Sequence, residues 1–265
     1  MGVGVFYLVP FLDVIRRTFT SIMGNSFIGL ENIKMVLNNE AFQLAVYNTV
    51  HFVTVCIPIL LILSLMIALL LQKQTVFNKL MKSAFLVPMS IPIASIVLLW
   101  NILFHPNGML NNFLHNFGKS IDWMNSSYAF GVLVFSYVWK NLGYTIVLWL
   151  AGLSGIPFSI YEAAEVDGAG RWQSFWYITV PNLWATVFII TVLSIVNSFK
   201  VFREAYLVAG SYPHESIYML QHLFNNWFRE LSIDKMAAGA VLNSAVLLIL
   251  ILVLQKICGG MENRM

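Results

Sequence analysis

The chain has 265 residues, of which 59% are hydrophobic and only 10% are charged. An ordinary globular chain has about 45–50% apolar and about 25% charged residues, so this chain carries too little charge to cover a water-exposed surface. The composition excludes a soluble single-domain protein and a disordered chain, and a net charge of +3 gives no reason to expect nucleic acid as a partner.

The first predicted element is an apolar stretch from Val3 to Leu12, which Asp13, Arg16 and Arg17 follow closely. A shortened first membrane span and the core of a signal peptide are the two interpretations of such a stretch. We favour the shortened span, because no basic leader precedes the stretch and no small-residue cleavage site follows it. Residues 1–40 are therefore expected to hold this span and an external segment.

Five further segments are long, apolar and almost free of charge. A helix needs about 20 mainly apolar residues to cross the roughly 30 Å hydrocarbon core, where its backbone polar groups must be satisfied within the helix. Unbroken apolar runs also differ from the alternating pattern of a transmembrane β-barrel. The sequence therefore predicts an all-α, polytopic membrane protein with about six transmembrane helices. The five full spans are expected near residues 46–71, 83–104, 127–151, 181–203 and 236–257.

The orientation follows from the short connection after the first full span. This connection carries Lys73, Lys79 and Lys82 and no acidic residue, so the positive-inside rule predicts that it is cytoplasmic. Each later connection then alternates sides, and acidic residues in a loop count little in this rule. We expect a five-span core over residues 41–258 with a cytoplasmic loop at 153–180, external segments at 105–126 and 204–235, and a cytoplasmic tail at 259–265.

The cytoplasmic loop at 153–180 has the pattern of a short helix. Pro157 breaks the preceding span, and Ser159 with Glu162 matches a capping box that opens a helix. We expect Glu162, Glu165 and Asp167 to lie in the first two turns, where negative charge suits the helix dipole. Gly168 and Gly170 are candidates for the left-handed residue that ends the helix.

A second amphipathic segment with Trp172, Phe175 and Trp176 follows, and Pro181 opens the next span. An interfacial helix pair lying against lipid is one interpretation of this loop, since tryptophan is common at headgroup level. Interfacial helices usually carry Lys and Arg on their polar face, whereas the first helix here is acidic. This difference favours docking on a protein partner.

One spaced motif connects this loop with a known family. Glu162-Ala163-Ala164, three further residues, Gly168, nine further residues and Ile178-Thr-Val-Pro181 resemble the EAA loop of permease subunits of binding-protein-dependent ABC importers. The usual pattern ends Ile-x-Leu-Pro, and Val180 replaces that leucine. Neighbouring residues resemble the carbohydrate branch of maltose and glycerol-3-phosphate type permeases, and the resemblance extends from about Phe27 to the end of the chain.

The resemblance implies a multi-pass permease of the bacterial plasma (inner) membrane. Its expected partners are a second homologous permease, two copies of a cytoplasmic ATP-binding subunit and an extracytoplasmic sugar-binding protein. ATP and Mg²⁺ would be bound by the ATPase subunits, so this chain is expected to hold no cofactor and to be no enzyme. The EAA segment would be the coupling helix that docks on the ATPase. The residues carried over to that role are Glu162, Ala163, Ala164 and Gly168, with Asp167 and Arg171 as flanking candidates.

Polar residues inside two spans are candidates for the substrate path. Lys140 falls near the middle of a span, with Asn141 and Tyr144 beside it, and ionisable groups in a bilayer usually face an interior cavity. Asn197 and Phe199 combine an amide with a ring, which suits a sugar. Snorkelling or pairing with a neighbouring permease is the alternative for Lys140, and lipid contact or packing is the alternative for Phe199. We also expect Gly143 to loosen the helix beside Lys140.

The external stretch at 206–235 is rich in aromatic residues, which suits a landing surface for the binding protein or an aromatic belt. His214 and His222 are eight residues apart, which is not the spacing of a helical metal site. A secondary, ion-coupled transporter is the main alternative function, but it tends to show intramembrane acids and repeated halves, and neither is evident here. An integral membrane enzyme would need a catalytic cluster near an interface, and none is apparent.

Overall fold

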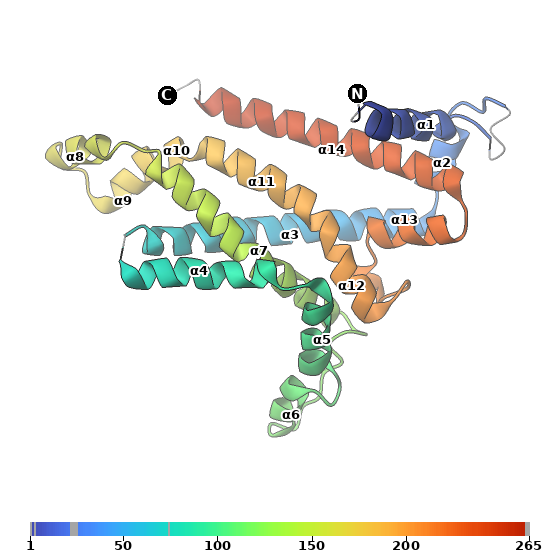
Figure 1. Ribbon diagram of the computed structural model, residues 1–265, viewed down its shortest axis with the longest axis horizontal. Coiled ribbons are helices and arrows are strands. Elements are labelled where there is room, and N and C mark those ends of the chain that lie inside the picture. The colour runs from blue at the N-terminus through green and yellow to red at the C-terminus, as the bar shows by residue number, and fades with distance from the viewer. Residues whose placement is uncertain (1, 3, 22–25, 74, 263–265) are drawn as a thin grey trace. The chain divides into compact units, whose positions relative to one another are not determined.

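A computed structural model describes residues 2, 4–21, 26–73 and 75–262 of the chain. Figure 1 shows that these residues form helices joined by short connections, and an isolated bridge between Thr20 and Phe27 is their one pairing of extended backbone. Within this described part, five helical segments are long and apolar enough to cross a membrane, which confirms the all-α architecture with five full spans. These segments are Glu40–Leu71, Ile93–His115, Tyr128–Ser154, Trp184–Ala209 and Ile233–Gly260.

The N-terminal apolar stretch forms a short helix. A π-helical turn, η1 (Gly4–Leu8), runs into α1 (Val9–Thr18), while Val3 lies outside the described residues. The apolar side chains of this helix are largely exposed, with Phe6 at 76%. This helix is too short to be counted among the five candidate spans. A second short helix, α2 (Glu31–Leu37), precedes the first full span.

The span expected at residues 83–104 is not one helix. The chain forms α4 (Val76–Ser90), breaks at Ile91 and Pro92, and continues as α5 (Ile93–Phe104). Ile91 is extended, with φ −75° and ψ 128°, because the ring of a following proline disfavours the helical conformation. The candidate span therefore begins at Ile93 and includes α6 (Met109–His115).

The other long helices follow the sequence pattern more closely. The first full span is α3 (Glu40–Leu71), the third is α7 (Tyr128–Ser154), and the last helix is α14 (Ile233–Glu262). The fourth is assembled from α11 (Trp184–Ser198), a 3₁₀ turn η3 (Phe199–Val201) and α12 (Phe202–Ala209). Because it continues to Ala209 and not to 203, it contains Glu204, which is only 4% exposed. The expectation that these spans contain no acidic residue is therefore wrong.

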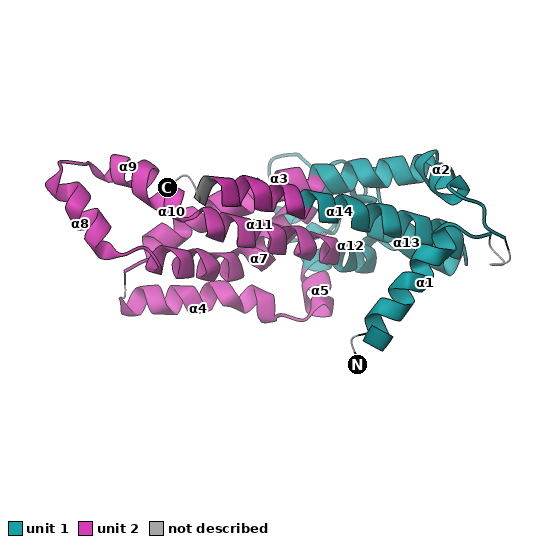
Figure 2. Cartoon of the chain, turned by 90° about the horizontal axis from the view of Figure 1, so that it is seen from above, with its two compact units in different colours: residues 1–51, 100–130, 202–250 teal, residues 52–99, 131–201, 251–265 magenta. Residues whose placement is uncertain are grey.

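The chain divides into two compact units, shown in different colours in Figure 2. Unit 1 contains residues 1–51, 100–130 and 202–250, and unit 2 contains residues 52–99, 131–201 and 251–265. Both connections predicted to be cytoplasmic, the lysine-rich one and the one after α7, belong to unit 2. Both connections predicted to be external belong to unit 1.

Unit 1 has its own apolar core, built where the start of α3 meets α13 (Leu220–Arg229). Phe42 stacks on Trp227 with ring centroids 6.3 Å apart. Two polar side chains of α3 add hydrogen bonds to this contact. The Asn48 side-chain amide donates to the Tyr218 carbonyl at 2.9 Å, and the Leu220 backbone N–H donates to the Thr49 hydroxyl at 3.1 Å.

The core of unit 2 lies among α3, α4, α7 and α11. Trp149 is fully buried there, and its indole N–H donates to the Ser64 hydroxyl at 2.9 Å. Gly143 does not loosen α7, which is continuous from Tyr128 to Ser154. A Cβ at Gly143 would lie 1.9 Å from the Phe85 carbonyl oxygen of α4, so this glycine permits close helix packing.

Candidate functional site

The connection between α7 and α11 contains α8 (Phe158–Val166), α9 (Arg171–Ser174), a π-helical turn η2 (Phe175–Thr179) and α10 (Val180–Asn182). Pro157 is the N-cap of α8, in an extended conformation, and no side chain caps the helix. The capping box expected from Ser159 and Glu162 is therefore wrong. The helix begins at Phe158, two residues before the start that an N-cap at Ser159 implies, because proline is extended here and carries no N–H that needs a partner.

The end of α8 is a Schellman turn. Gly168 has φ +83°, its N–H donates to the Glu165 carbonyl at 3.0 Å, and the Ala169 N–H donates to the Ala164 carbonyl at 2.9 Å. These two bonds satisfy helix-end carbonyls in the usual six-residue pattern. The left-handed stop is thus Gly168, as expected. Gly170 has φ −73° instead and serves as the N-cap of α9.

Of the three acidic residues expected in the first two turns, Glu162 lies in the second turn of α8, whereas Glu165 and Asp167 lie at its C-terminal end. The first turn holds no acid, whereas Glu162 lies mid-helix, Glu165 lies near the C-terminal end and Asp167 is the C-cap. All three side chains are exposed. Negative charge near a helix C-terminus opposes the dipole by about 0.3–1 kcal/mol per group when exposed. These acids therefore do not help α8 to form, and they stay available to a positively charged partner.

Both ends of this connection are fixed in the core of unit 2. Ile156 and Leu183 are buried in that core, and Tyr161 and Ile178 pack against it. The Tyr161 hydroxyl is also 2.9 Å from the Thr179 hydroxyl, which joins α8 to η2. The sequence pattern did not predict this bond, because the two residues are 18 positions apart and meet only after the turn at Gly168.

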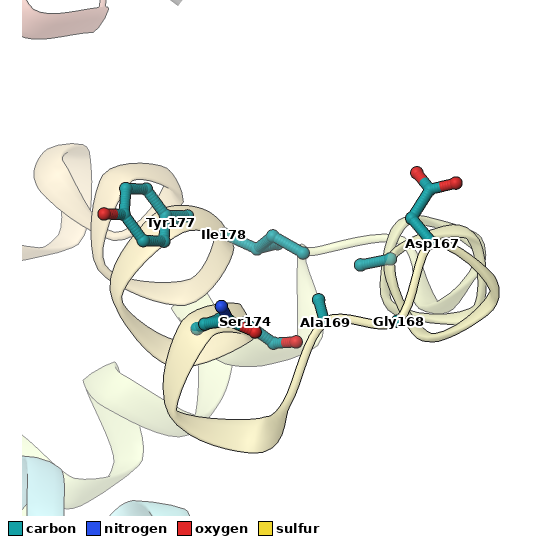
Figure 3. A pocket seen from close by; sticks show the side chains of 8 residues that line it. Asp167, Gly168, Ala169, Ser174, Tyr177 and Ile178 are labelled. Carbon is teal, nitrogen blue, oxygen red and sulfur yellow. The ribbon is translucent and has the colours of Figure 1, made fainter.

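An open groove of about 390 Å³ separates α8 from the segment that follows it. In Figure 3, Asp167 and Gly168 lie across this groove from Ser174 and Tyr177. Four of its eight lining residues are glycine, alanine or serine, so a side chain of another protein has room to enter. The groove is lined by Ala164, Asp167, Gly168, Ala169, Gln173, Ser174, Tyr177 and Ile178.

The structure brings the six candidate coupling residues together on this connection. Glu162 and Ala163 are exposed on α8, while Ala164 is half-buried and faces the groove. Arg171 is the first residue of α9 and is also exposed. The arrangement presents one short, acidic helix that packs Tyr161 against the core of unit 2 and leaves Glu162, Ala163 and Glu165 exposed.

The candidate path residues lie on two helices of unit 2. Lys140, Asn141 and Tyr144 are half-buried on α7, and Asn197 and Phe199 are half-buried at the end of α11 and in η3. These helices touch one turn earlier, where the Tyr137 hydroxyl donates to the Ser194 carbonyl at 2.6 Å.

The two asparagines among these path candidates already have local partners. The Asn141 side chain donates to the Tyr137 carbonyl at 2.8 Å, and the Lys200 ammonium donates to the Asn197 side-chain oxygen at 2.7 Å. Both bonds lie within a single helical segment and do not join α7 to α11. The assignment of the five residues to a substrate path stays a prediction.

The aromatic residues of the external stretch differ in exposure, and Tyr206 and Phe224 are half-buried. Tyr218 and Trp227 are buried in the core of unit 1, whereas Tyr212 and Phe228 are 72% and 60% exposed. Tyr212 and Phe228 therefore offer the most ring surface to a partner or to lipid.

His222 is another buried residue of this stretch. Its Nδ1 accepts the Met219 N–H at 3.2 Å, and its buried Nε2 has no hydrogen-bond partner within the described residues. Burial of the ring lowers the pKa of His222 to about 4.

Five apolar segments long enough to span a membrane, joined by a connection that carries an exposed acidic helix, define a multi-pass membrane protein. Residues 60–259 match the family model described as "Binding-protein-dependent transport system inner membrane component". The chain belongs to this family, and it is a multi-pass protein of the inner membrane. A secondary, ion-coupled transporter is not favoured, because members of this family work with a binding protein.

Named relatives and a solved structure agree with this membership. The chain is 31% identical over 263 residues to the arabinooligosaccharides transport system permease protein AraP of Bacillus subtilis, covering 96% of this chain and 82% of that protein. It is 29% identical over 231 residues to the trehalose/maltose transport system permease protein MalF of Thermococcus litoralis, covering 84% and 78%. A chain of a bacterial ABC transporter involved in alginate import has the same fold, with a TM-score of 0.80 at 21% identity, covering 97% of this chain and 90% of that one.

Proposed function

We propose that this chain is the membrane-spanning permease subunit of an ATP-driven importer of an oligosaccharide or a related sugar. The observation that carries the proposal is α8, an exposed helix with three acids, held between two spans in a chain of the binding-protein-dependent family. The names of AraP and MalF support the sugar class. The chain forms half of the translocation path and performs no chemistry itself.

In this proposal, formation of the path, ATP hydrolysis and delivery of the sugar are carried out by separate proteins. A second homologous permease completes the path, and two cytoplasmic subunits bind ATP and Mg²⁺ and hydrolyse the nucleotide. An extracytoplasmic binding protein delivers the sugar on the other side. Import then follows from two states of the permease pair, biased by nucleotide inside and by loaded binding protein outside.

The coupling step rests on the geometry of α8. The exposed Cβ of Ala163 and the Schellman turn at Gly168 allow the backbone of a partner to approach closely. Glu162, Glu165 and Asp167 add a negative field that suits a basic groove on the ATPase. The bond between Tyr161 and Thr179 would carry movement of α8 into the helical run that leads to α11.

Replacement of Ala163 by leucine tests this coupling. We expect uptake to fall by about tenfold or more, which is the effect of losing about 1.4 kcal/mol of interface energy, and loaded binding protein to stop stimulating ATP hydrolysis. The side chain of Ala163 is exposed, so folding and membrane insertion should not change. Ala163→Ser is the matched control, since it keeps a small side chain at the same position and should preserve both activities.

A second variant, Tyr161→Phe, separates docking from transmission. It removes only the hydroxyl that meets Thr179, so the ATPase should still bind while uptake per ATP hydrolysed decreases. The measurements are sugar uptake into proteoliposomes and ATPase rates of the reconstituted complex. The coupling assignment is wrong if Ala163→Leu leaves both uptake and ATPase stimulation intact.

A further inference from the structure

Three aromatic side chains that follow the Schellman turn form a cluster on the outside of unit 2. Trp172, Phe175 and Trp176, here called the aromatic cluster, are spaced i, i+3 and i+4, which places them on one face of a helical segment. Trp172 stacks on Phe175 with ring centroids 5.9 Å apart, and Trp176 meets Phe175 edge-on at 5.3 Å. Trp172 is nonetheless 73% exposed and Trp176 is 53% exposed.

The aromatic cluster lies at the entrance to a membrane span. The backbone is helical from Arg171 through η2 to the end of α10, and the candidate span Trp184–Ala209 begins two residues later. Tryptophan is enriched where a helix enters the membrane, because its ring is apolar and its N–H can reach water or headgroups. Ile178 and Leu183 later in the same run pack in the core of unit 2, whereas Trp172 and Trp176 stay exposed.

Charge separates this segment from α8. The three acids of α8 end at Asp167, and no aspartate or glutamate follows until Glu204. The one charged residue between Asp167 and the span is Arg171, which is exposed at the start of α9. The cytoplasmic leaflet carries negative charge, which attracts basic residues and repels acidic ones. The segment that carries the aromatic cluster therefore suits a lipid surface, whereas α8 does not.

We propose that the aromatic cluster binds the headgroup region of the cytoplasmic leaflet. The turn at Gly168 then divides the connection into two functions: α8 extends into solvent, and the segment from Arg171 to Tyr177 lies at the bilayer surface. Binding of the aromatic cluster to the bilayer surface holds α8 at a fixed distance from the membrane. A force on α8 is then transmitted to α11. This inference rests on the membrane location of the chain and not on the assignment of α8 to coupling.

Site-directed spin labelling of the full chain in nanodiscs tests the proposal. Trp172→Cys and Trp176→Cys carry the nitroxide, and Glu165→Cys on α8 is the control, all in a background with Cys56 and Cys258 replaced by alanine. The nanodiscs contain phosphatidylethanolamine and phosphatidylglycerol. Collision rates with oxygen, which concentrates in lipid, and with a nickel chelate, which stays in water, give the depth of each label.

We expect the labels at 172 and 176 to lie at headgroup depth, with nickel collisions severalfold below those at 165. The collision rates of the labels at 172 and 176 should not change when the cognate ATPase subunit is added. Labels at 172 and 176 that collide with nickel as often as the label at 165 would overturn the proposal. The same holds for labels that are protected only after the ATPase is added, because the cluster is then a protein interface.

Quenching by lipid supplies a second measurement that keeps all native cysteines. Lipids brominated near the headgroup quench nearby tryptophans, and the double variant Trp172→Phe with Trp176→Phe retains aromatic rings at both positions. We expect the wild-type chain to lose a larger fraction of its fluorescence than the double variant. Equal quenching of the two proteins contradicts the anchor, whatever the outcome of the coupling experiment at Ala163.

Discussion

Replacement of Gly143 by alanine should separate α7 from α4. An ideal Cβ at this position lies 1.9 Å from the Phe85 carbonyl oxygen and 2.3 Å from its carbonyl carbon. Both atoms belong to the backbone of α4, so no side-chain rotation relieves the contact. Real Cβ atoms essentially never approach another atom within 3.0 Å, and α4 must therefore move by about 1 Å at this crossing.

The loss of stability caused by Gly143→Ala follows from the contacts that this shift of α4 weakens. A gap of about 0.5–1 Å forfeits a quarter to a half of the dispersion energy of each atom pair across it. Phe85 and Leu142 pack against the core of unit 2 beside this crossing, so their contacts weaken together. Overpacking of this kind costs about 1–3 kcal/mol, from which the higher helix propensity of alanine returns at most about 1 kcal/mol.

The control is a glycine on the same helix. A Cβ at Gly131 meets nothing within 4 Å, so Gly131→Ala should be neutral or should stabilise α7 by up to about 1 kcal/mol. Thermal unfolding in nanodiscs, followed by near-ultraviolet circular dichroism, measures both variants. For a chain of this size about 1 kcal/mol corresponds to about 2–4 °C in Tm. A Gly143→Ala variant as stable as Gly131→Ala would refute the close approach of α7 to α4.

Two further predictions concern single ionisable groups. If Lys140 lines the substrate path, Lys140→Met should lower uptake by about tenfold or more, the effect of losing one hydrogen bond to a charged group, with membrane amounts unchanged on immunoblots. Unchanged uptake would remove Lys140 from the path. The pKa of buried His222 is lowered from 6.5 to about 4, so the unfolded state binds the extra proton between these values. Stability should be complete above pH 6.5 and fall by about 1.4 kcal/mol per pH unit as the pH decreases toward 4. His222→Gln should abolish this slope in unfolding measurements, and a slope that persists would assign it to other groups.

The spans were predictable because membrane insertion depends on composition alone. A run of about 20 apolar residues is helical in a bilayer whatever its neighbours are, so α3, α7 and α14 lie close to their expected positions. The short helix at the predicted coupling loop was also visible in the sequence, because Pro157 and Gly168 act on the backbone next to them. The family motif was likewise a matter of local spacing and needed no tertiary contact.

Helix ends and packing were not predictable in the same way. The sequence suggested a capping box with Ser159 as the N-cap, but Pro157 is the N-cap instead, so α8 begins two residues earlier and Glu165 and Asp167 lie at its C-terminal end. The break at Ile91 and Pro92 depended on which of two prolines, Pro88 or Pro92, would interrupt the helix, and Pro88 lies inside α4. Such choices are decided by packing energies that a single sequence does not display.

The low charge of the sequence determined that this is a membrane protein and where its spans lie. Only the tertiary structure decided what the polar and small residues touch. It placed Gly143 against the backbone of α4, joined Tyr161 to Thr179 across 18 residues, and left Trp172 exposed beside a span. The reason is physical: burial in lipid acts on each segment separately, whereas a contact between segments depends on the positions of both.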